Sequence, residues 1–180
     1  MDREKLDSYC EKGIWGLVLA VLVLGPLATG LLRPQDFVYG GWLVFAAAAL
    51  WAVRIWVKPS FRLFCPPIAY AALAFVIYGV WRAGNSELEY FARQEAIHVV
   101  IYGLLFFVVL NNLHRQEASH IAAITLIVLG MVISFYSIYQ FVSGSDSVWH
   151  FTRPPGYEKR GSGTYICPNH LAGFLEMILP

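Results

Sequence analysis

Long apolar stretches, separated by short polar segments, dominate the pattern of this chain. Five of them contain no Asp, Glu, Lys or Arg and are 17 to 22 residues long. A helix that crosses the hydrocarbon core of a bilayer needs roughly 20 apolar residues. The pattern therefore predicts five membrane-spanning helices, at Ile14–Leu32, Phe37–Val53, Leu63–Trp81, Ile97–Leu113 and Ile121–Val142.

A sixth apolar segment begins at His170 and reaches the last residue, Pro180. As a helix, its 11 residues would cover roughly 16 Å, about half of a bilayer. We interpret residues 170–180 as the start of a sixth span and expect the chain to be the N-terminal portion of a longer protein. A re-entrant segment is the alternative. The predicted fold class is all-α, a polytopic bundle of transmembrane helices.

The composition supports a membrane protein. Hydrophobic residues make up 58% of the chain and charged residues 14%, whereas a soluble domain carries about 25% charged residues. We expect the additional apolar surface to face membrane lipids. A net charge of +1 gives no reason to expect a nucleic-acid partner. Cys10, Cys65 and Cys167 lie far apart without metal-ligand spacing, so we expect neither a disulfide framework nor a metal or other cofactor.

Basic residues next to the spans set the predicted orientation. Three precede the first span and one follows it, which favours a cytoplasmic N-terminus. Residues 1–13 carry mixed charges and are interpreted as a cytoplasmic segment, not as a signal peptide. After the five-span region 14–142, residues 143–169 then form an outer loop. Residues 82–96 form another, with a predicted amphipathic helix on the membrane surface. Arg54 is expected to snorkel from its span toward water.

The loop before the sixth apolar segment concentrates groups that bind anions. Arg153, Lys159 and Arg160 supply positive charge, and an arginine guanidinium can hold a phosphate through two hydrogen bonds. Gly161 and Gly163 permit backbone conformations in which successive N–H groups converge on an anion. A proline at the start of the following helix would direct the positive end of its dipole into the loop. The predicted ligand is the phosphate or diphosphate of a lipid.

Each of these groups also has a simpler interpretation. Arginines at a membrane interface bind lipid headgroups of many kinds, and Asn169 can cap a helix. His170 fits a hydrogen-bonded residue at the interface. Glu176 lies two turns into an apolar segment, where a carboxylate is unfavourable unless it faces a partner or a polar cavity. It is therefore an intramembrane functional candidate, or a neutral residue paired with another helix.

One segment resembles a known family. The pattern Arg-x-x-Gly-Thr-(x)3-Pro-Asn, continued by Ala-Gly and Glu-Met, is similar to that of the O-antigen ligases. The related O-antigen polymerases and protein O-oligosaccharyltransferases are similar as well. The residues that carry the resemblance are Arg160, Gly163, Thr164, Pro168, Asn169, Ala172, Gly173, Glu176, Met177 and Pro180.

The resemblance implies a metal-independent glycosyltransferase with a GT-C-like fold in the bacterial inner membrane. Such enzymes move a glycan from a polyprenyl-diphosphate carrier to an acceptor on the periplasmic face. The acceptor is lipid A-core for the ligases and a protein hydroxyl for the oligosaccharyltransferases. Arg160 would be the catalytic residue that binds the donor diphosphate and stabilises the leaving group. The other implied ligands of the donor are Arg153, Gly161, Gly163, Thr164, Asn169 and His170.

The family also depends on a later periplasmic loop with another Arg and a His, so residues 1–180 alone are expected to be inactive. A different class of protein remains as an alternative, namely a lipid-binding protein or transporter that holds a lipid phosphate with the same basic loop. No repeat relates residues 14–81 to residues 97–180, which counts against a transporter built from repeats. A purely structural membrane subunit is the last alternative.

Overall fold

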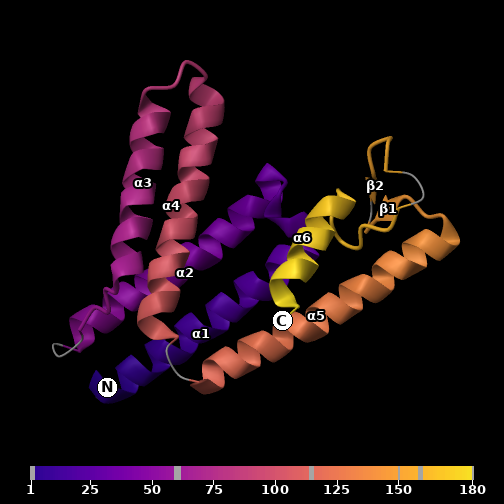
Figure 1. The fold of residues 1–180 in the computed structure, drawn as a ribbon. Coiled ribbons are helices and arrows are strands. Elements are labelled where there is room, and N and C mark those ends of the chain that lie inside the picture. The colour runs from indigo at the N-terminus through magenta and orange to yellow at the C-terminus, as the bar shows by residue number, and fades with distance from the viewer. Residues whose placement is uncertain (1–2, 59–61, 114–115, 150, 158–159, 180) are drawn as a thin grey trace. The chain divides into compact units, whose positions relative to one another are not determined.

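The structure is a computed structural model that describes residues 3–58, 62–113, 116–149, 151–157 and 160–179. These residues form six α-helices, one short 3-10 helix and one two-stranded antiparallel sheet (Figure 1). The α-helices are α1 (Arg3–Leu27), α2 (Pro34–Val57), α3 (Pro67–Gly84), α4 (Glu89–Asn112), α5 (Gln116–Ser143) and α6 (Pro168–Ile178). The 3-10 helix is η1 (Thr29–Leu31), and the strands are β1 (Ser147–Val148) and β2 (Phe151–Thr152).

Helices α1 to α5 are each long and apolar enough to cross a membrane. The prediction of a helical chain with five long apolar segments is confirmed, and the length and composition of these helices suggest a multi-pass membrane protein. Several helices extend beyond the predicted spans, because polar residues continue them at their ends. In α1 the helix begins at Arg3, so the described part of the predicted N-terminal segment 1–13 belongs to the first membrane helix.

The predicted outer loop at residues 82–96 is mostly helical. Helix α3 continues to Gly84 and α4 begins at Glu89, so residues 85–88 form the connection. Glu89 favours this early start, because its charge complements the helix dipole and its carboxylate pairs with Arg93 over 2.6 Å. The predicted surface helix is therefore the first part of α4 and is continuous with the fourth span.

A strained turn separates α1 from α2. Thr29, Gly30 and Leu31 have φ values of 55°, 74° and 56°, in the left-handed region that residues other than glycine rarely adopt. The Thr29 hydroxyl donates to Asp36 Oδ2 over 2.8 Å, which fixes the turn to the first turn of α2. Because of this turn, regular α-helix ends at Leu27 and not at the predicted end of the first span.

The chain divides into two compact units. Unit 1 comprises Met1–Val18 and Gly41–Arg115, and unit 2 comprises Leu19–Gly40 and Gln116–Pro180. In unit 1, α3 and α4 form an antiparallel hairpin (Figure 1). Glycine permits their close approach, since a Cβ added at Gly103 would lie 2.5 Å from Val76 Cγ2. Small residues at such contacts are typical of membrane helices.

Unit 1 also buries a charged network. Arg54 of α2 is only 5% exposed, and its Nε and Nη2 donate to Asp7 Oδ1 and Glu11 Oε2, both over 2.6 Å. Its Nη1 donates to Asn112 Oδ1 over 2.9 Å. Asp7 and Glu11 lie four residues apart and therefore share one face of α1. Arg54 does not snorkel as expected, because these partners hold its guanidinium between α1, α2 and α4.

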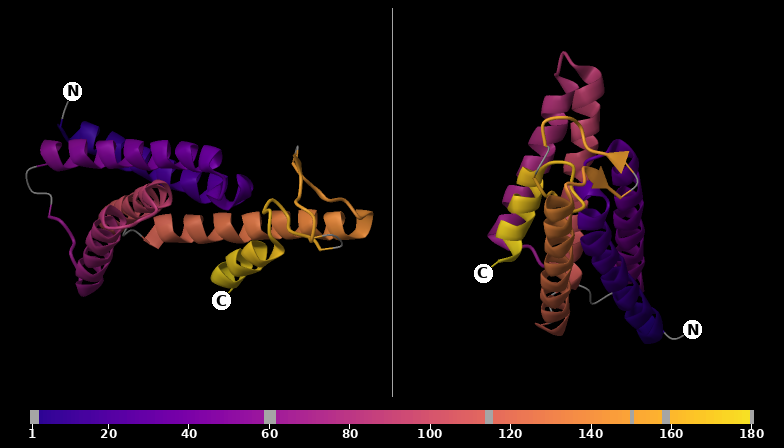
Figure 2. Two further views of the ribbon diagram at one scale, coloured as in Figure 1. Left: turned by 90° about the horizontal axis from the view of Figure 1, so that it is seen from above. Right: turned by 90° about the vertical axis from the view of Figure 1, so that its right-hand side faces the viewer.

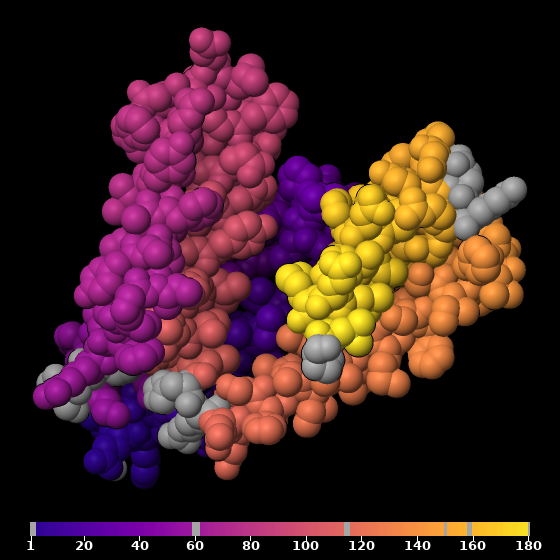
Figure 3. Space-filling view, viewed as in Figure 1, coloured from indigo at the N-terminus to yellow at the C-terminus, as the bar shows by residue number. Residues whose placement is uncertain are grey.

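In unit 2, the chain folds back after α5, so that α6 runs antiparallel along it (Figure 2). Figure 3 shows the surface of α6 resting against that of α5. The buried apolar cluster between them consists of Leu129, Ile133, Tyr165, Leu171 and Phe174. This cluster fixes the beginning of α6 beside the loop that carries the candidate residues.

Candidate functional site

The loop between α5 and α6 begins with a short hairpin. Strands β1 and β2 pair in antiparallel register, with Val148 opposite Phe151. Trp149 follows β1 with a φ of 52°, and its ring stacks on Tyr136 of α5 at a centroid distance of 6.0 Å. The Phe151 ring in turn lies under the guanidinium of Arg33, 5.0 Å from it. Aromatic contacts therefore hold the first half of the loop to α5 and to residues before α2.

Gln140 of α5 holds both halves of the loop. Its side-chain oxygen accepts the backbone N–H groups of Ser162 (3.0 Å) and Gly163 (2.8 Å). Its side-chain nitrogen donates to the carbonyl oxygens of Ser147 and Gly163, each over 2.9 Å. Successive N–H groups of the glycine segment thus converge as expected, but they converge on Gln140 and not on an open anion site.

Arg153, a predicted ligand of the donor, is buried. Its Nη1 donates to the carbonyl of Arg160 and to Ser162 Oγ, and its Nη2 donates to Asp146 Oδ1 over 2.8 Å and to the Ser145 carbonyl over 3.4 Å. These partners are all protein groups of the same loop. Arg153 therefore braces the loop from within, in contrast to the ligand-binding role expected for it.

Side chains of the loop also cap the end of α1. The Thr164 hydroxyl donates to the Pro26 carbonyl over 2.6 Å, and Trp149 Nε1 donates to the Leu27 carbonyl over 2.8 Å. Carbonyls in the last turn of a helix have no partner within it. Thr164 is buried, so its position in the predicted site is that of a support for the loop.

Two glycines bring the loop into direct contact with α5. A Cβ at Gly161 would overlap the Ser137 carbonyl oxygen, and a Cβ at Gly163 would lie 2.5 Å from Ile133 Cγ2. Gly163 also has a φ of 60°, which glycine adopts at no steric cost. The two glycines are needed for close packing and for the turn, so they shape the site without lining it.

Arg160 and Asn169 meet at the start of α6. Both side chains are exposed, and Arg160 Nη2 donates to Asn169 Oδ1 over 3.3 Å. Pro168 occupies the first turn of α6, as predicted, and Cys167 is the residue at its N-cap. Asn169 therefore lies inside the first turn and does not cap the helix. The exposed guanidinium stands at the positive end of the α6 dipole.

The thiol of Cys167 reports on this environment. Burial alone raises its pKa, but hydrogen bonds from the backbone N–H of Asn169 and from the Tyr157 hydroxyl outweigh burial. The backbone N–H of His170 and the charge of Arg160 act in the same direction, so the pKa of Cys167 is lowered overall. The hydrogen bond to Cys167 in turn raises the pKa of Tyr157. The start of α6 thus stabilises negative charge.

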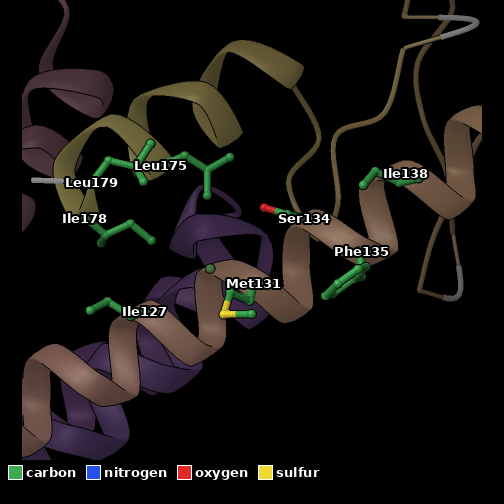
Figure 4. A pocket seen from close by; sticks show the side chains of 9 residues that line it. Ile127, Met131, Ser134, Phe135, Ile138, Leu175, Ile178 and Leu179 are labelled. Atoms are coloured by element: carbon green, nitrogen blue, oxygen red, sulfur yellow. The ribbon is translucent and has the colours of Figure 1, made fainter.

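His170 and Glu176 are both exposed on α6. Glu176 follows Asn169 by seven residues, or about two helical turns, so these two side chains share a face that α5 does not cover. Figure 4 shows a groove beside α5 that is lined on the other side by Leu175 and Ile178 of α6 and by Leu179, which follows α6. This groove has a volume of about 380 Å³ and an almost entirely apolar lining, which suits hydrocarbon.

The predicted residues thus fall into two groups. The first group is exposed at the start of α6 or along it and consists of Arg160, Asn169, His170 and Glu176. The second group holds or shapes the loop and consists of Arg153, Gly161, Gly163 and Thr164. Lys159 and Pro180 lie outside the described residues. The sequence interpretation missed Gln140 and Trp149. Gln140 left a signal, because an amide within a charge-free run of apolar residues requires a polar partner.

Comparison with family models, with curated proteins and with solved structures finds no match to this chain.

Proposed function

We propose that the chain is the N-terminal part of an O-antigen ligase-type glycosyltransferase. Such an enzyme transfers a glycan from a polyprenyl-diphosphate carrier to lipid A-core or a related acceptor. The proposal rests on the sequence pattern at residues 160–180 and on one structural observation. Arg160 and Asn169 are exposed together at the start of α6, whereas the neighbouring polar residue Arg153 is bound within the protein.

Arg160 would bind the diphosphate of the donor. A guanidinium carries five N–H donors, so it can contact Asn169 and a phosphate at the same time. When the glycan is transferred, a hydroxyl oxygen of the acceptor forms a bond to the anomeric carbon and releases its proton to solvent. The bond between that carbon and the diphosphate oxygen breaks, and negative charge grows on the departing oxygen. Arg160 and the positive end of the α6 dipole would stabilise this charge. No metal is required, because the cation is supplied by the side chain.

The remaining residues would serve this site in different ways. Gly161, Gly163 and Thr164 shape the loop, and Arg153 braces it. His170 and Glu176 are exposed on α6 and are available to the acceptor. The isoprenoid chain of the donor would lie against apolar surfaces such as the groove between α5 and α6.

The proposed topology is that of a GT-C-like bundle in the bacterial inner membrane. If the N-terminus is cytoplasmic, five spans place the loop after α5 on the opposite, periplasmic side. A lipid-linked donor that is presented on the periplasmic face would then reach Arg160 directly. Tagging residues of this loop with a membrane-impermeant reagent in intact cells tests the orientation.

The decisive variant is Arg160→Ala in the native, full-length protein. We expect loss of glycan transfer with unchanged abundance in the membrane, and partial activity for Arg160→Lys, because an ammonium cannot make the two-pronged contact of a guanidinium. The matched control is Arg93→Ala, which removes an exposed arginine paired with Glu89 on α4 and should leave transfer unchanged. Wild-type transfer by Arg160→Ala would rule out Arg160 as the diphosphate ligand.

Transfer to different acceptors, together with binding of undecaprenyl diphosphate, separates the related functions. An O-antigen polymerase or a protein O-oligosaccharyltransferase would depend equally on Arg160 but would use a glycan or a protein hydroxyl as the acceptor. A lipid-binding protein or transporter without catalysis would bind undecaprenyl diphosphate in an Arg160-dependent way and give no product with any of the three acceptors.

A further inference from the structure

Gln140 differs from the small hydroxyl side chains of Thr125 and Ser143 on α5 in where its hydrogen bonds go. The hydroxyls of Thr125 and Ser143 donate to carbonyls of their own helix, at Ile121 and Tyr139. Such local bonds are the usual solution for hydroxyl side chains in a membrane helix. Gln140 is 2% exposed, and its amide is directed outward from the helix to the loop. A buried amide is unfavourable unless its donors and acceptors are all paired.

The loop satisfies the amide of Gln140 completely. The oxygen accepts two backbone N–H groups, and the two N–H groups of the nitrogen have two carbonyl acceptors, all within 2.8 to 3.0 Å. The amide oxygen has two lone pairs and the nitrogen two hydrogens, so every position is used. A leucine or methionine of similar size would be simpler in this apolar helix. The amide therefore serves the loop and not the helix.

The consequence of these bonds is a fixed backbone next to Arg160. Gln140 binds the N–H of Ser162 and both main-chain groups of Gly163, and Arg153 binds the carbonyl of Arg160 itself. With the backbone of residues 160–163 held from two sides, the exposed guanidinium moves only through its own side-chain torsions. A ligand that binds such a preorganised group does not have to order the loop.

We infer that Gln140 is a positioning residue, which holds residues 160–163 on α5 so that the Arg160 guanidinium is presented to a lipid diphosphate. This inference rests on the function proposed above and adds to it a residue outside the sequence pattern at 160–180. Gln140 touches no ligand and acts only through the loop.

The test is a double-mutant cycle measured as binding of undecaprenyl diphosphate to the detergent-solubilised full-length protein. Gln140→Met keeps the size of the side chain and removes all four hydrogen bonds, and we expect about tenfold weaker binding, the equivalent of about 1.4 kcal/mol. Gln140→Glu keeps the acceptor for the two backbone N–H groups, and its protonated carboxyl can donate to one of the two carbonyls, so it should restore part of the affinity. In an Arg160→Ala background, Gln140→Met should change the affinity less than about twofold, because the two residues act as one unit.

Hydrogen exchange provides a readout that does not depend on the ligand. In Gln140→Met we expect the amides of Ser162 and Gly163 to exchange at least about tenfold faster, because their acceptor is gone. The matched control is Ser143→Ala, one turn further along α5, whose hydroxyl bonds only to its own helix. It should change neither the exchange of these amides nor the affinity.

The outcomes separate this inference from the proposed function. An equal loss of affinity from Gln140→Met with and without Arg160 would show a general effect on folding and overturn the positioning role. Faster exchange with unchanged affinity would overturn it as well. If Arg160→Ala binds undecaprenyl diphosphate as well as the wild type, the proposed function itself fails, and the exchange result then describes a structural contact only.

Discussion

Two buried arginines, one in each unit, are used in opposite ways. Arg54 in unit 1 is bound by the carboxylates of Asp7 and Glu11 and by Asn112, all of which lie on helices. Arg153 in unit 2 is bound mainly by groups of its own loop, and Asp146 supplies its one described carboxylate contact. The first arginine joins helices to each other, whereas the second gives a loop its internal structure.

The difference explains where chemistry can occur. In unit 1 the charges are neutralised by each other within a network of helices, so the network serves stability. In unit 2 the amide of Gln140, both Nη atoms of Arg153 and the hydroxyl of Thr164 bond to groups of the protein and hold the loop. Arg160 remains exposed at the positive end of a helix. A loop whose backbone is held by hydrogen bonds, and whose described residues include an exposed guanidinium, is suited to binding an anion.

Removal of Arg54 should have the largest effect on the stability of the protein. Arg54→Met would remove the guanidinium from the mostly buried Asp7 and Glu11 and leave Asp7 its pair with Lys58 Nζ over 3.6 Å. Losing one partner of a buried pair costs about 3 kcal/mol or more. We expect a large drop in the Tm of the detergent-solubilised protein, measured by circular dichroism. As a control, Arg93→Met removes the exposed pair with Glu89 and should leave Tm nearly unchanged. A stable Arg54→Met protein would mean that the network does not hold unit 1 together.

Gly163→Ala should have the next largest effect, in unit 2. The substitution forces alanine into a positive φ and brings its Cβ to 2.5 Å from Ile133 Cγ2. The left-handed conformation alone costs about 1 kcal/mol or more, and the overlap with α5 adds to it. We expect unfolding to begin at a lower temperature and the loop to exchange faster. Gly173→Ala is the control, because it adds a Cβ into open space on α6 and should stabilise that helix.

The helices were predictable because their signal is local. A charge-free run of apolar residues identifies a membrane helix without knowledge of its neighbours, and all five appeared. Their ends were less predictable. Nothing near Asp7 in the sequence indicates that its partner is Arg54, 47 residues away, so the sequence predicts a separate segment at residues 1–13. Whether charged residues continue a helix therefore depends on ion pairs with residues that are distant in the sequence.

In the loop, too, the sequence does not indicate which groups are paired by tertiary contacts. The arginines and glycines of residues 153–163 predict an anion-binding loop, but the sequence could not tell which of these groups would bind to other groups of the protein. The convergent N–H groups were expected for an anion and are bound by Gln140. Which of several cations stays exposed depends on tertiary contacts, and only Arg160 does so among the described arginines of this loop.

A smaller loss of stability is expected from Thr164→Val, which tests whether the polar side chains of unit 2 stabilise the loop. Valine keeps the shape of threonine but removes the donor to the Pro26 carbonyl, a bond of 2.6 Å in a part-buried position. Leaving such an acceptor unpaired costs about 1 to 3 kcal/mol, and we expect a modest drop in Tm. Thr125→Val, whose hydroxyl is exposed and bonds within α5, should cost less. Equal losses for both variants would show that the contact with α1 contributes little.

The smallest effect concerns the charge at the start of α6. Because the pKa of Cys167 is lowered, its thiolate forms at a lower pH than an ordinary thiol, and iodoacetamide should modify it at a correspondingly lower pH. Arg160 is one of several causes of this shift, so Arg160→Ala should move the profile slightly upward. Peptide mass spectrometry follows Cys167 separately from the exposed Cys65, which serves as the internal reference. If the pH dependence of Cys167 modification is the same in Arg160→Ala, the guanidinium does not lie over the start of α6. Arg160 would then be no better placed than the buried Arg153 to bind an anion there.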